Sequence, residues 1–219
     1  QSLVESNRVD GMLLTRALED DRALQYLSQA NFPTALTGTC RYDNIIQVDT
    51  DNEGAAEKMT TLLIGKGFRR FAFLVKNMSY NVDRKRHEGF CRALIKNGIA
   101  EQDQLFYNGS NRMEFLDAII ENIISKKVEC IICGDDEICT MVMSRLQAEG
   151  YRIPKDVAIA SLYNSTNLDC YSPAVTAVSV AASQMGGTAV RQLIQRLRGE
   201  NYEKKTMLDY DILFRKSTN

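Results

Sequence analysis

Short apolar runs alternate with longer amphipathic stretches along the 219 residues of the chain. Short runs predict buried strands, and stretches with apolar positions three or four residues apart predict helices that cover a sheet. A strand that recurs after each helix is typical of βαβ units, so the pattern favours an α/β fold with mostly parallel sheets. The predicted strands span residues 9–14, 33–36, 44–48, 70–75, 103–107, 129–133, 157–162, 175–180 and 207–214.

The helices between these strands have clear ends. Four are followed by a glycine, which favours a left-handed C-terminal cap: Gly67, Gly98, Gly150 and Gly199. Nine successive strands would make one very wide sheet, so we expect two sheets of similar size with helices on both faces. The predicted helices span residues 20–30, 52–66, 83–97, 112–126, 136–149 and 182–198.

Composition narrows the class of protein. The chain is 44% apolar, with 27 basic and 28 acidic residues and a net charge of −1, so it lacks the basic surface that nucleic acid or anionic membranes require. Its longest apolar runs, such as Cys130–Cys133, are far shorter than the roughly 20 residues of a membrane-spanning helix. No export signal is visible. We therefore expect a soluble, cytoplasmic protein with no membrane partner.

Six cysteines in a chain of this length are too few for a disulfide scaffold, and buried thiols are expected. Cys130 and Cys133 form a C-x-x-C sequence, but this odd spacing within a strand sends the two sulfurs to opposite faces. The chain has a single histidine, His87. Neither a metal site nor a cofactor is expected.

The sequence contains no recognisable catalytic motif. His87 lies beside Arg84, Lys85 and Arg86 and is predicted to face solvent near a helix start. Nucleophile-elbow, phosphate-loop and dinucleotide-binding motifs are absent from the sequence. We predict no catalytic residue and a protein that is not an enzyme, with an enzyme acting on a sugar or phosphosugar as a minor alternative.

Three polar clusters follow predicted strands, at the carboxyl ends where open α/β sheets bind ligands. They are Thr15–Arg16, Asn81–Arg86 and Gly134–Glu137. Each has a structural explanation as well, because Asp51 and Asp136 would cap helices and the basic residues would form a solvated first turn.

Seven short motifs occur in a fixed order between about Arg8 and Lys216. In sequence and order they resemble the effector-binding core of the lactose-repressor/galactose-repressor family of bacterial transcription regulators. The motifs are RVDGMLL (8–14), VDTDNEGA (48–55), GFRRFAF (67–73), RHEGF (86–90), ICGDD (132–136), GYRIPKDV (150–157) and PAVTAV (173–178), followed by Met185–Gly186.

This resemblance implies a periplasmic-binding-protein-like fold of type I. Such a fold has two Rossmann-like lobes with parallel sheets, joined by three crossovers, and the effector binds between the lobes. The implied amino-terminal lobe is 1–78 with 181–204, and the carboxy-terminal lobe is 79–180 with 205–219. The amino-terminal lobe is expected to be truncated, with an open sheet edge near Val9–Thr15, and the DNA-binding helix-turn-helix domain to be absent from this chain.

The resemblance also implies a ligand site. Physically, Arg86 offers a fork of donors and Asp51 and Asp135 offer acceptors, a combination that suits a polyhydroxylated ligand. Tyr163 stands where the family commonly has an aspartate, which leaves the identity of the effector open, although its ring could stack on a sugar. The implied ligand-binding residues are Thr15, Arg16, Asp51, Arg86, Asp135, Tyr163 and Asn164.

The function implied is that of a homodimeric transcription regulator, acting as a repressor. A sugar or sugar derivative would close the two lobes and so control operator DNA binding by the missing amino-terminal domain. The alternative is a solute-binding protein of a transporter, with a sugar in the same cleft. Six cysteines and the lack of a visible export signal favour the regulator.

Overall fold

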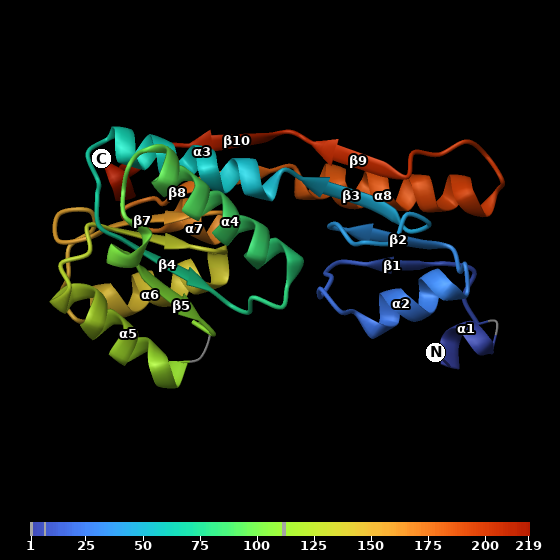
Figure 1. The fold of residues 1–219 in the computed structure, drawn as a ribbon, viewed down its shortest axis with the longest axis horizontal. Helices are drawn as coiled ribbons and strands as arrows, with labels where there is room; N and C mark the ends of the chain where they lie inside the picture. The colour runs from blue at the N-terminus through green and yellow to red at the C-terminus, as the bar shows by residue number, and fades with distance from the viewer. Residues whose placement is uncertain (1, 7, 111–112) are drawn as a thin grey trace. The chain divides into compact units, whose positions relative to one another are not determined.

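The computed structural model describes residues 2–6, 8–110 and 113–219, and the chain separates into two compact units (Figure 1). Unit 1 consists of Gln1–Asp51, Ser79–Val82 and Ala181–Asp209. Unit 2 consists of Asn52–Met78, Asp83–Val180 and Tyr210–Asn219. Each unit has its own sheet and its own apolar core, so each is described separately.

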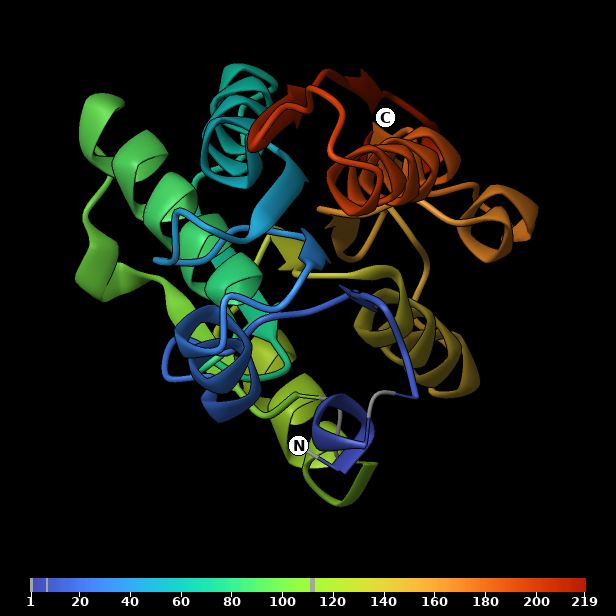
Figure 2. The same cartoon turned by 90° about the vertical axis from the view of Figure 1, so that its right-hand side faces the viewer.

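Unit 1 is built on a four-stranded parallel sheet with the strand order β1-β2-β3-β9. Neighbouring residues of its strands alternate between the two faces, so Leu36 packs under α2 while Ala35 packs under α8. The two helices therefore lie on opposite sides of this sheet, as Figures 1 and 2 show. The elements are α1 (Ser2–Glu5), β1 (Met12–Leu14), α2 (Arg22–Gln29), β2 (Thr34–Thr37), β3 (Ile46–Thr50), α8 (Ala182–Leu197) and β9 (Lys205–Leu208).

Unit 2 contains a six-stranded sheet with the order β10-β8-β7-β6-β4-β5, parallel except for β10. The first two residues of its helix α4 are counted with unit 1. The elements are α3 (Asn52–Gly65), β4 (Phe71–Val75), α4 (Asn81–Lys96), η1 (Glu101–Asp103), β5 (Leu105–Asn108), α5 (Met113–Ser125), β6 (Cys130–Cys133), α6 (Asp136–Ala148), β7 (Ala158–Ser161), α7 (Thr166–Cys170), β8 (Thr176–Val180), β10 (Tyr210–Leu213) and η2 (Lys216–Thr218).

Helices cover both faces of the unit 2 sheet, with α3 and α4 on one side and α5 and α6 on the other (Figure 1). Cys130 belongs to the apolar cluster under α3 and α4, whereas Cys133 belongs to the cluster under α5 and α6. The two sulfurs therefore lie on opposite faces, as the odd spacing predicted. Burial raises the pKa of both thiols, which keeps them protonated and unreactive.

Local signals in the sequence located the helices within a few residues. The four predicted capping glycines all have positive φ angles, of 105° at Gly67, 65° at Gly98, 82° at Gly150 and 71° at Gly199. The predicted start of one helix at Arg112 lies outside the described residues, and the structure gives that helix from Met113. The short helices α1 and α7 were not predicted, because four or five residues are too few to show a helical period.

One predicted strand was wrong. Residues 207–214 form the end of β9 and all of β10, which belong to different sheets and are separated by Asp209. β9 pairs with β3 in unit 1, and β10 pairs antiparallel with β8 in unit 2. Both halves of the segment mix exposed and partly buried residues, so the pattern carries no sign of the change of sheet.

The units also differ from the predicted lobes. Residues 52–78 belong to unit 2 rather than to the amino-terminal lobe, and residues 79–82 and 205–209 belong to unit 1 rather than to the carboxy-terminal lobe. The physical reason is packing, because Met59 and Leu63 of α3 share one apolar cluster with Phe71 and Phe73 of β4. The chain therefore changes unit directly after β3, at Asp51.

A glycine sets the distance between α3 and α4. A Cβ atom at Gly89 would collide with the carbonyl oxygen of Glu53 and would lie 3.0 Å from the Cβ of Ala56. The α4 backbone therefore lies directly against α3, and any larger residue at position 89 would force the helices apart. This contact explains why the motif Arg86-His87-Glu88-Gly89-Phe90 contains a glycine in mid-helix, where glycine otherwise costs stability.

We expect Gly89→Ala to lower the free energy of unfolding by about 2–3 kcal/mol, because overpacking of close backbones is relieved only by moving a helix. Urea denaturation followed by circular dichroism measures the change. Gly187→Ala is the matched control: no atom would lie within 4 Å of the new Cβ in mid-α8, so a gain of about 0.5–1 kcal/mol is expected. Equal effects of the two substitutions would contradict the close approach of α3 and α4.

Candidate functional site

The carboxyl ends of parallel strands meet at one edge of a sheet, and in unit 2 this edge is rich in polar side chains. Lys76 follows β4, Asp135 follows β6, and Tyr163 and Asn164 follow β7. Helix α4 adds Arg86 to the same group. The structure therefore brings together four of the predicted site residues, Arg86, Asp135, Tyr163 and Asn164, at the carboxyl edge of one sheet.

Arg86 is a buried charge of this edge, with 7% of its surface exposed. Its Nε donates a hydrogen bond to the Oδ1 atom of Asn52 at 3.1 Å, and its Nη1 donates to the carbonyl of Gly134 at 2.5 Å. These bonds connect α4 to the first residue of α3 and to the turn between β6 and α6. A guanidinium buried to this degree is stable only when its donors have partners, so Arg86 also holds the edge in shape.

Asp135 caps helix α6. Its Oδ1 accepts a hydrogen bond of 3.0 Å from the backbone N–H of Ile138, and its Oδ2 lies 2.8 Å from the ammonium of Lys76. The sequence suggested Asp136 for the capping role, but Asp136 lies in the first turn and Asp135 performs it. Both carboxylate oxygens of Asp135 thus have partners within unit 2.

Lys76 was missed by the sequence analysis although it directly follows a buried strand. Its side chain is only 11% exposed and contacts the carboxylates of both Asp135 and Glu137. Burial by itself would lower the pKa of Lys76, but hydrogen bonds and the negative charges of these two carboxylates outweigh it and raise the pKa above its usual value. Lys76 therefore remains charged. Its position after β4 was the signal that could have identified it.

Tyr163 and Asn164 follow β7 but are held differently. The backbone N–H and C=O of Tyr163 are within hydrogen-bond distance of the hydroxyl of Ser161, at 3.3 and 2.6 Å, and this turn fixes the half-buried residue. The Oδ1 atom of Asn164 accepts a hydrogen bond of 2.9 Å from Arg215, which also forms an ion pair with Asp169. The carbonyl of the Asn164 side chain is therefore used within the fold.

The remaining predicted site residues, Thr15, Arg16 and Asp51, belong to unit 1. Thr15 and Arg16 follow β1 and Asp51 follows β3, so the three share the carboxyl edge of the unit 1 sheet. All three are exposed. The guanidinium of Arg16 lies over the ring of Tyr80, 4.9 Å from its centroid, which gives this flexible side chain a preferred position.

His87 does not face solvent as predicted. It is half-buried, and its ring centroid lies 4.3 Å from that of Phe106 and 5.8 Å from that of Phe73. The three basic neighbours in the sequence suggested a fully solvated turn, but His87 is directed toward the aromatic side chains of β4 and β5. This contact arises from tertiary packing and leaves no trace in the local sequence.

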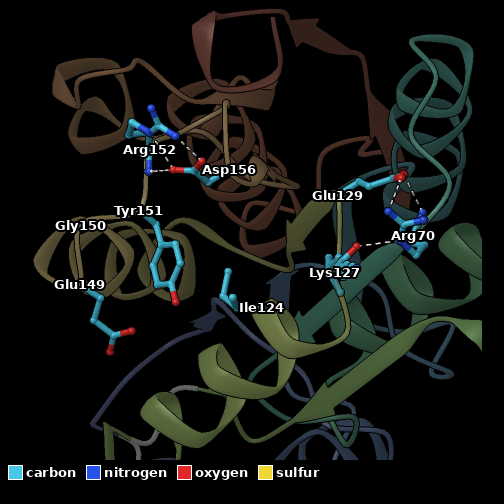
Figure 3. A pocket seen from close by; sticks show the side chains of 10 residues that line it. Arg70, Ile124, Lys127, Glu129, Glu149, Gly150, Tyr151, Arg152 and Asp156 are labelled. Carbon is cyan, nitrogen blue, oxygen red and sulfur yellow. Dashed lines mark hydrogen bonds and ion pairs between the residues drawn. The ribbon is translucent and has the colours of Figure 1, made fainter.

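A polar hollow lies at the opposite end of the unit 2 sheet, where β4, β6 and β7 begin (Figure 3). Its volume is about 720 Å³, and none of the predicted site residues lines it. Arg70 forms an ion pair with Glu129 at 2.7 Å, and Arg152 forms one with Asp156 at 2.8 Å. These charged side chains pair with each other within unit 2.

Within residues 2–6, 8–110 and 113–219, no three histidine, cysteine or acidic side chains gather closely enough to hold a metal ion. Over the same ranges, no helix has the length and apolar character that crossing a membrane requires.

The chain is similar to periplasmic-binding-protein-like domains and to transcription regulators. Residues 60–218 match the family described as periplasmic binding protein-like domain. The chain is 27% identical over 215 residues to the HTH-type transcriptional regulator CelR of Thermobifida fusca, a match that covers 95% of this chain and 63% of that protein. The chain spans about 63 to 65% of the length of the curated relatives it matches first.

Solved structures agree with this result. A crystal structure described as a transcriptional regulator LacI from Bacillus cereus subsp. cytotoxis is 30% identical, with a TM-score of 0.88 over 99% of this chain and 78% of that one. A complex of the transcriptional regulator CelR with cellobiose is 26% identical, with a TM-score of 0.85 over 99% of this chain and 68% of that one. The predicted α/β fold with two periplasmic-binding-protein-like lobes is thereby confirmed.

We expect Asp135→Ala to lower the free energy of unfolding by about 1–2 kcal/mol, because α6 loses its N-terminal cap and Lys76 loses a partner. Thermal and urea unfolding measure the change. Asp136→Ala is the matched control, since Asp136 lies in the same turn without being the cap, and a change within about 0.5 kcal/mol is expected. Similar losses in both variants would show that Asp135 is not the structural cap.

We also expect Asp156 to titrate at an unusually low pH. Hydrogen bonds from the side chain and backbone of Arg152 lower the pKa of Asp156 to about 2 from an ordinary value of 3.8. Because the folded pKa is depressed, the stabilisation is complete above pH 4–5, as a rough limit, and is lost as the pH falls through about 2. NMR titration of the Asp156 carboxyl tests this, and Arg152→Ala should return the pKa toward 3.8. A midpoint near 4 in the unmodified chain would contradict it.

Proposed function

Because this chain belongs to the periplasmic-binding-protein-like family and to its lactose-repressor/galactose-repressor regulators, we propose that it is the effector-binding core of a bacterial transcription repressor. The effector is a small sugar or sugar derivative. Its binding controls attachment to operator DNA by a helix-turn-helix domain that is not part of this chain.

The observation that carries this proposal is the constellation at the carboxyl edge of unit 2. Arg86 and Lys76 supply charged donors, Asp135 supplies a carboxylate, and each is fixed by the contacts described above. Sugar hydroxyls need donors and acceptors held in defined positions, and rigid side chains bind them with little loss of conformational entropy. The 26% identical regulator in complex with cellobiose supports a sugar as the ligand class.

Side chains of unit 1 are proposed to contribute as well. The Thr15 hydroxyl can donate and accept, the Arg16 guanidinium donates, and the Asp51 carboxylate accepts. Their exposure at the carboxyl edge of the unit 1 sheet supports this role. In unit 2, Tyr163 is proposed to pack its ring against the sugar, and the amide of Asn164 to donate a hydrogen bond.

The proposed activity is binding without chemical turnover. Regulation requires that the effector bind two states of the protein with different affinities, because a ligand that binds both equally shifts neither. A coupling of about 1–3 kcal/mol between effector and operator is typical of such proteins. We propose a cytoplasmic homodimer, since operators read by helix-turn-helix domains are usually two-fold symmetric.

We expect Arg86→Ala to weaken effector binding by about ten- to a hundredfold, the range for the loss of a hydrogen bond from a charged group. Calorimetric titration with a panel of sugars that includes cellobiose measures the affinity. The substitution should also reduce stability, because Asn52 and Gly134 lose their bonds to the guanidinium. Arg86→Lys keeps a charge without the planar fork and should show an intermediate affinity.

Arg92→Ala is the matched control for this experiment. Arg92 lies on the same helix but is exposed and pairs with Glu53 and Glu57 at the surface, so its loss should leave the affinity unchanged. A folded Arg86→Lys or Arg86→Ala variant with the original affinity would remove Arg86 from the binding site. If no sugar in the panel binds the original chain, the proposed effector class is wrong.

A further inference from the structure

The charges at the carboxyl edge of unit 2 discriminate between two kinds of sugar ligand. A phosphorylated sugar carries a dianion that needs a cation or a helix N-terminus to receive it. A neutral sugar needs only hydroxyl partners. Besides Arg86, the edge contains two features that could receive a phosphate, namely the ammonium of Lys76 and the N-terminus of α6.

Carboxylates of the chain itself already occupy both features. The carboxylate of Asp135 accepts the hydrogen bond from the N–H of Ile138 in the first turn of α6. The ammonium of Lys76 lies between Asp135 and Glu137. Lys76 and Asp135 expose only 11% and 14% of their side chains, so the pair is shielded from solvent and from salt. A phosphate would have to displace Asp135 from both partners at once.

A further carboxylate lies beside this edge. The buried carboxylate of Asp83, in the first turn of α4, accepts a hydrogen bond from the N–H of Asn77, which follows β4. A dianionic ligand would therefore meet carboxylates next to the ends of both β4 and β6.

From these contacts we infer that the carboxyl edge of unit 2 selects an uncharged polyhydroxyl ligand and rejects the phosphorylated form of the same sugar. This inference rests on the proposed function and adds the charge of the effector to it. Arg86 fits this selection, because two of its donors are directed to the neutral oxygens of Asn52 and Gly134 and hold it inside the fold. Lys76 and its two carboxylates are the residues that determine specificity.

The test compares each sugar with its phosphate by calorimetric titration of the full chain. The probes are glucose with glucose 6-phosphate, fructose with fructose 6-phosphate, and cellobiose. For any pair that binds, we expect the neutral sugar to bind at least about tenfold more tightly, because a dianion would meet the carboxylates of Asp83, Asp135 and Glu137. A phosphorylated sugar that binds as tightly as its neutral partner, or more tightly, would overturn the inference while leaving the proposed function intact.

A double variant tests whether the named residues are responsible. Asp135→Asn keeps a good helix cap, and Glu137→Gln keeps the size of the side chain, so together they leave Lys76 without either carboxylate while preserving α6. We expect the preference for the neutral sugar to fall by about tenfold. Glu121→Gln is the matched control. It removes a carboxylate from the exposed face of α5, whereas Lys76 pairs with Asp135 and Glu137, so the preference should be unchanged.

The outcomes are separable. An unchanged preference in the double variant would show that Lys76 and its carboxylates do not set the selectivity, which overturns the inference. Binding of no probe, neutral or phosphorylated, would instead count against the sugar effector proposed above, and the inference would fall with it. Far-ultraviolet circular dichroism confirms that each variant is folded before its affinity is compared.

Discussion

A buried guanidinium is the constraint on which the rest of unit 2 depends. Arg86 reaches from α4 to the first residue of α3 and to the turn after β6, and it can do so only because α4 lies directly against α3. Gly89, on the next turn of α4, permits that approach. Loss of the close contact would remove the Asn52 partner of a buried charged group, and breaking the hydrogen bonds of a buried charge is costly. The packing of unit 2 and the candidate binding edge thus both require the close approach of α3 and α4.

Asp135 is the second side chain, after Arg86, that the fold holds in place at this edge. One carboxylate oxygen caps α6 and the other faces Lys76, so the residue serves secondary structure and local electrostatics at the same time. Side chains that are held by the fold need little reordering when a ligand arrives, and this lowers the entropic cost of binding. The same arrangement places carboxylates where an anionic ligand would need cations. The contacts of Asp135 with α6 and Lys76 therefore account both for the rigidity of the edge and for its inferred selection against anionic ligands.

The fold and the comparisons with known regulators agree on a periplasmic-binding-protein-like core, and the polar carboxyl edges are where such α/β sheets bind ligands. Many unrelated proteins share α/β architectures, so the fold alone does not determine a function. The side chains at the carboxyl edge, rather than the fold, therefore support an effector as the ligand. A binding protein of this kind acts through differences in affinity between its states, and chemistry at a reactive group is unnecessary.

The sequence by itself determined the class of fold, the order of its elements and several local details. Periodic apolar positions identified nearly all the strands and long helices, glycines marked four helix ends, and the spacing of Cys130 and Cys133 fixed their opposite orientation. These features depend on a few neighbouring residues. The pairing of β9 and β10 with different sheets, the place of α3 in unit 2, the aromatic contacts of His87 and the burial of Lys76 between two carboxylates were decided only by the tertiary structure. Each depends on partners far away in the chain. The local sequence of an alternating or basic segment is the same whichever distant residues pack against it, so the sequence does not reveal the partner.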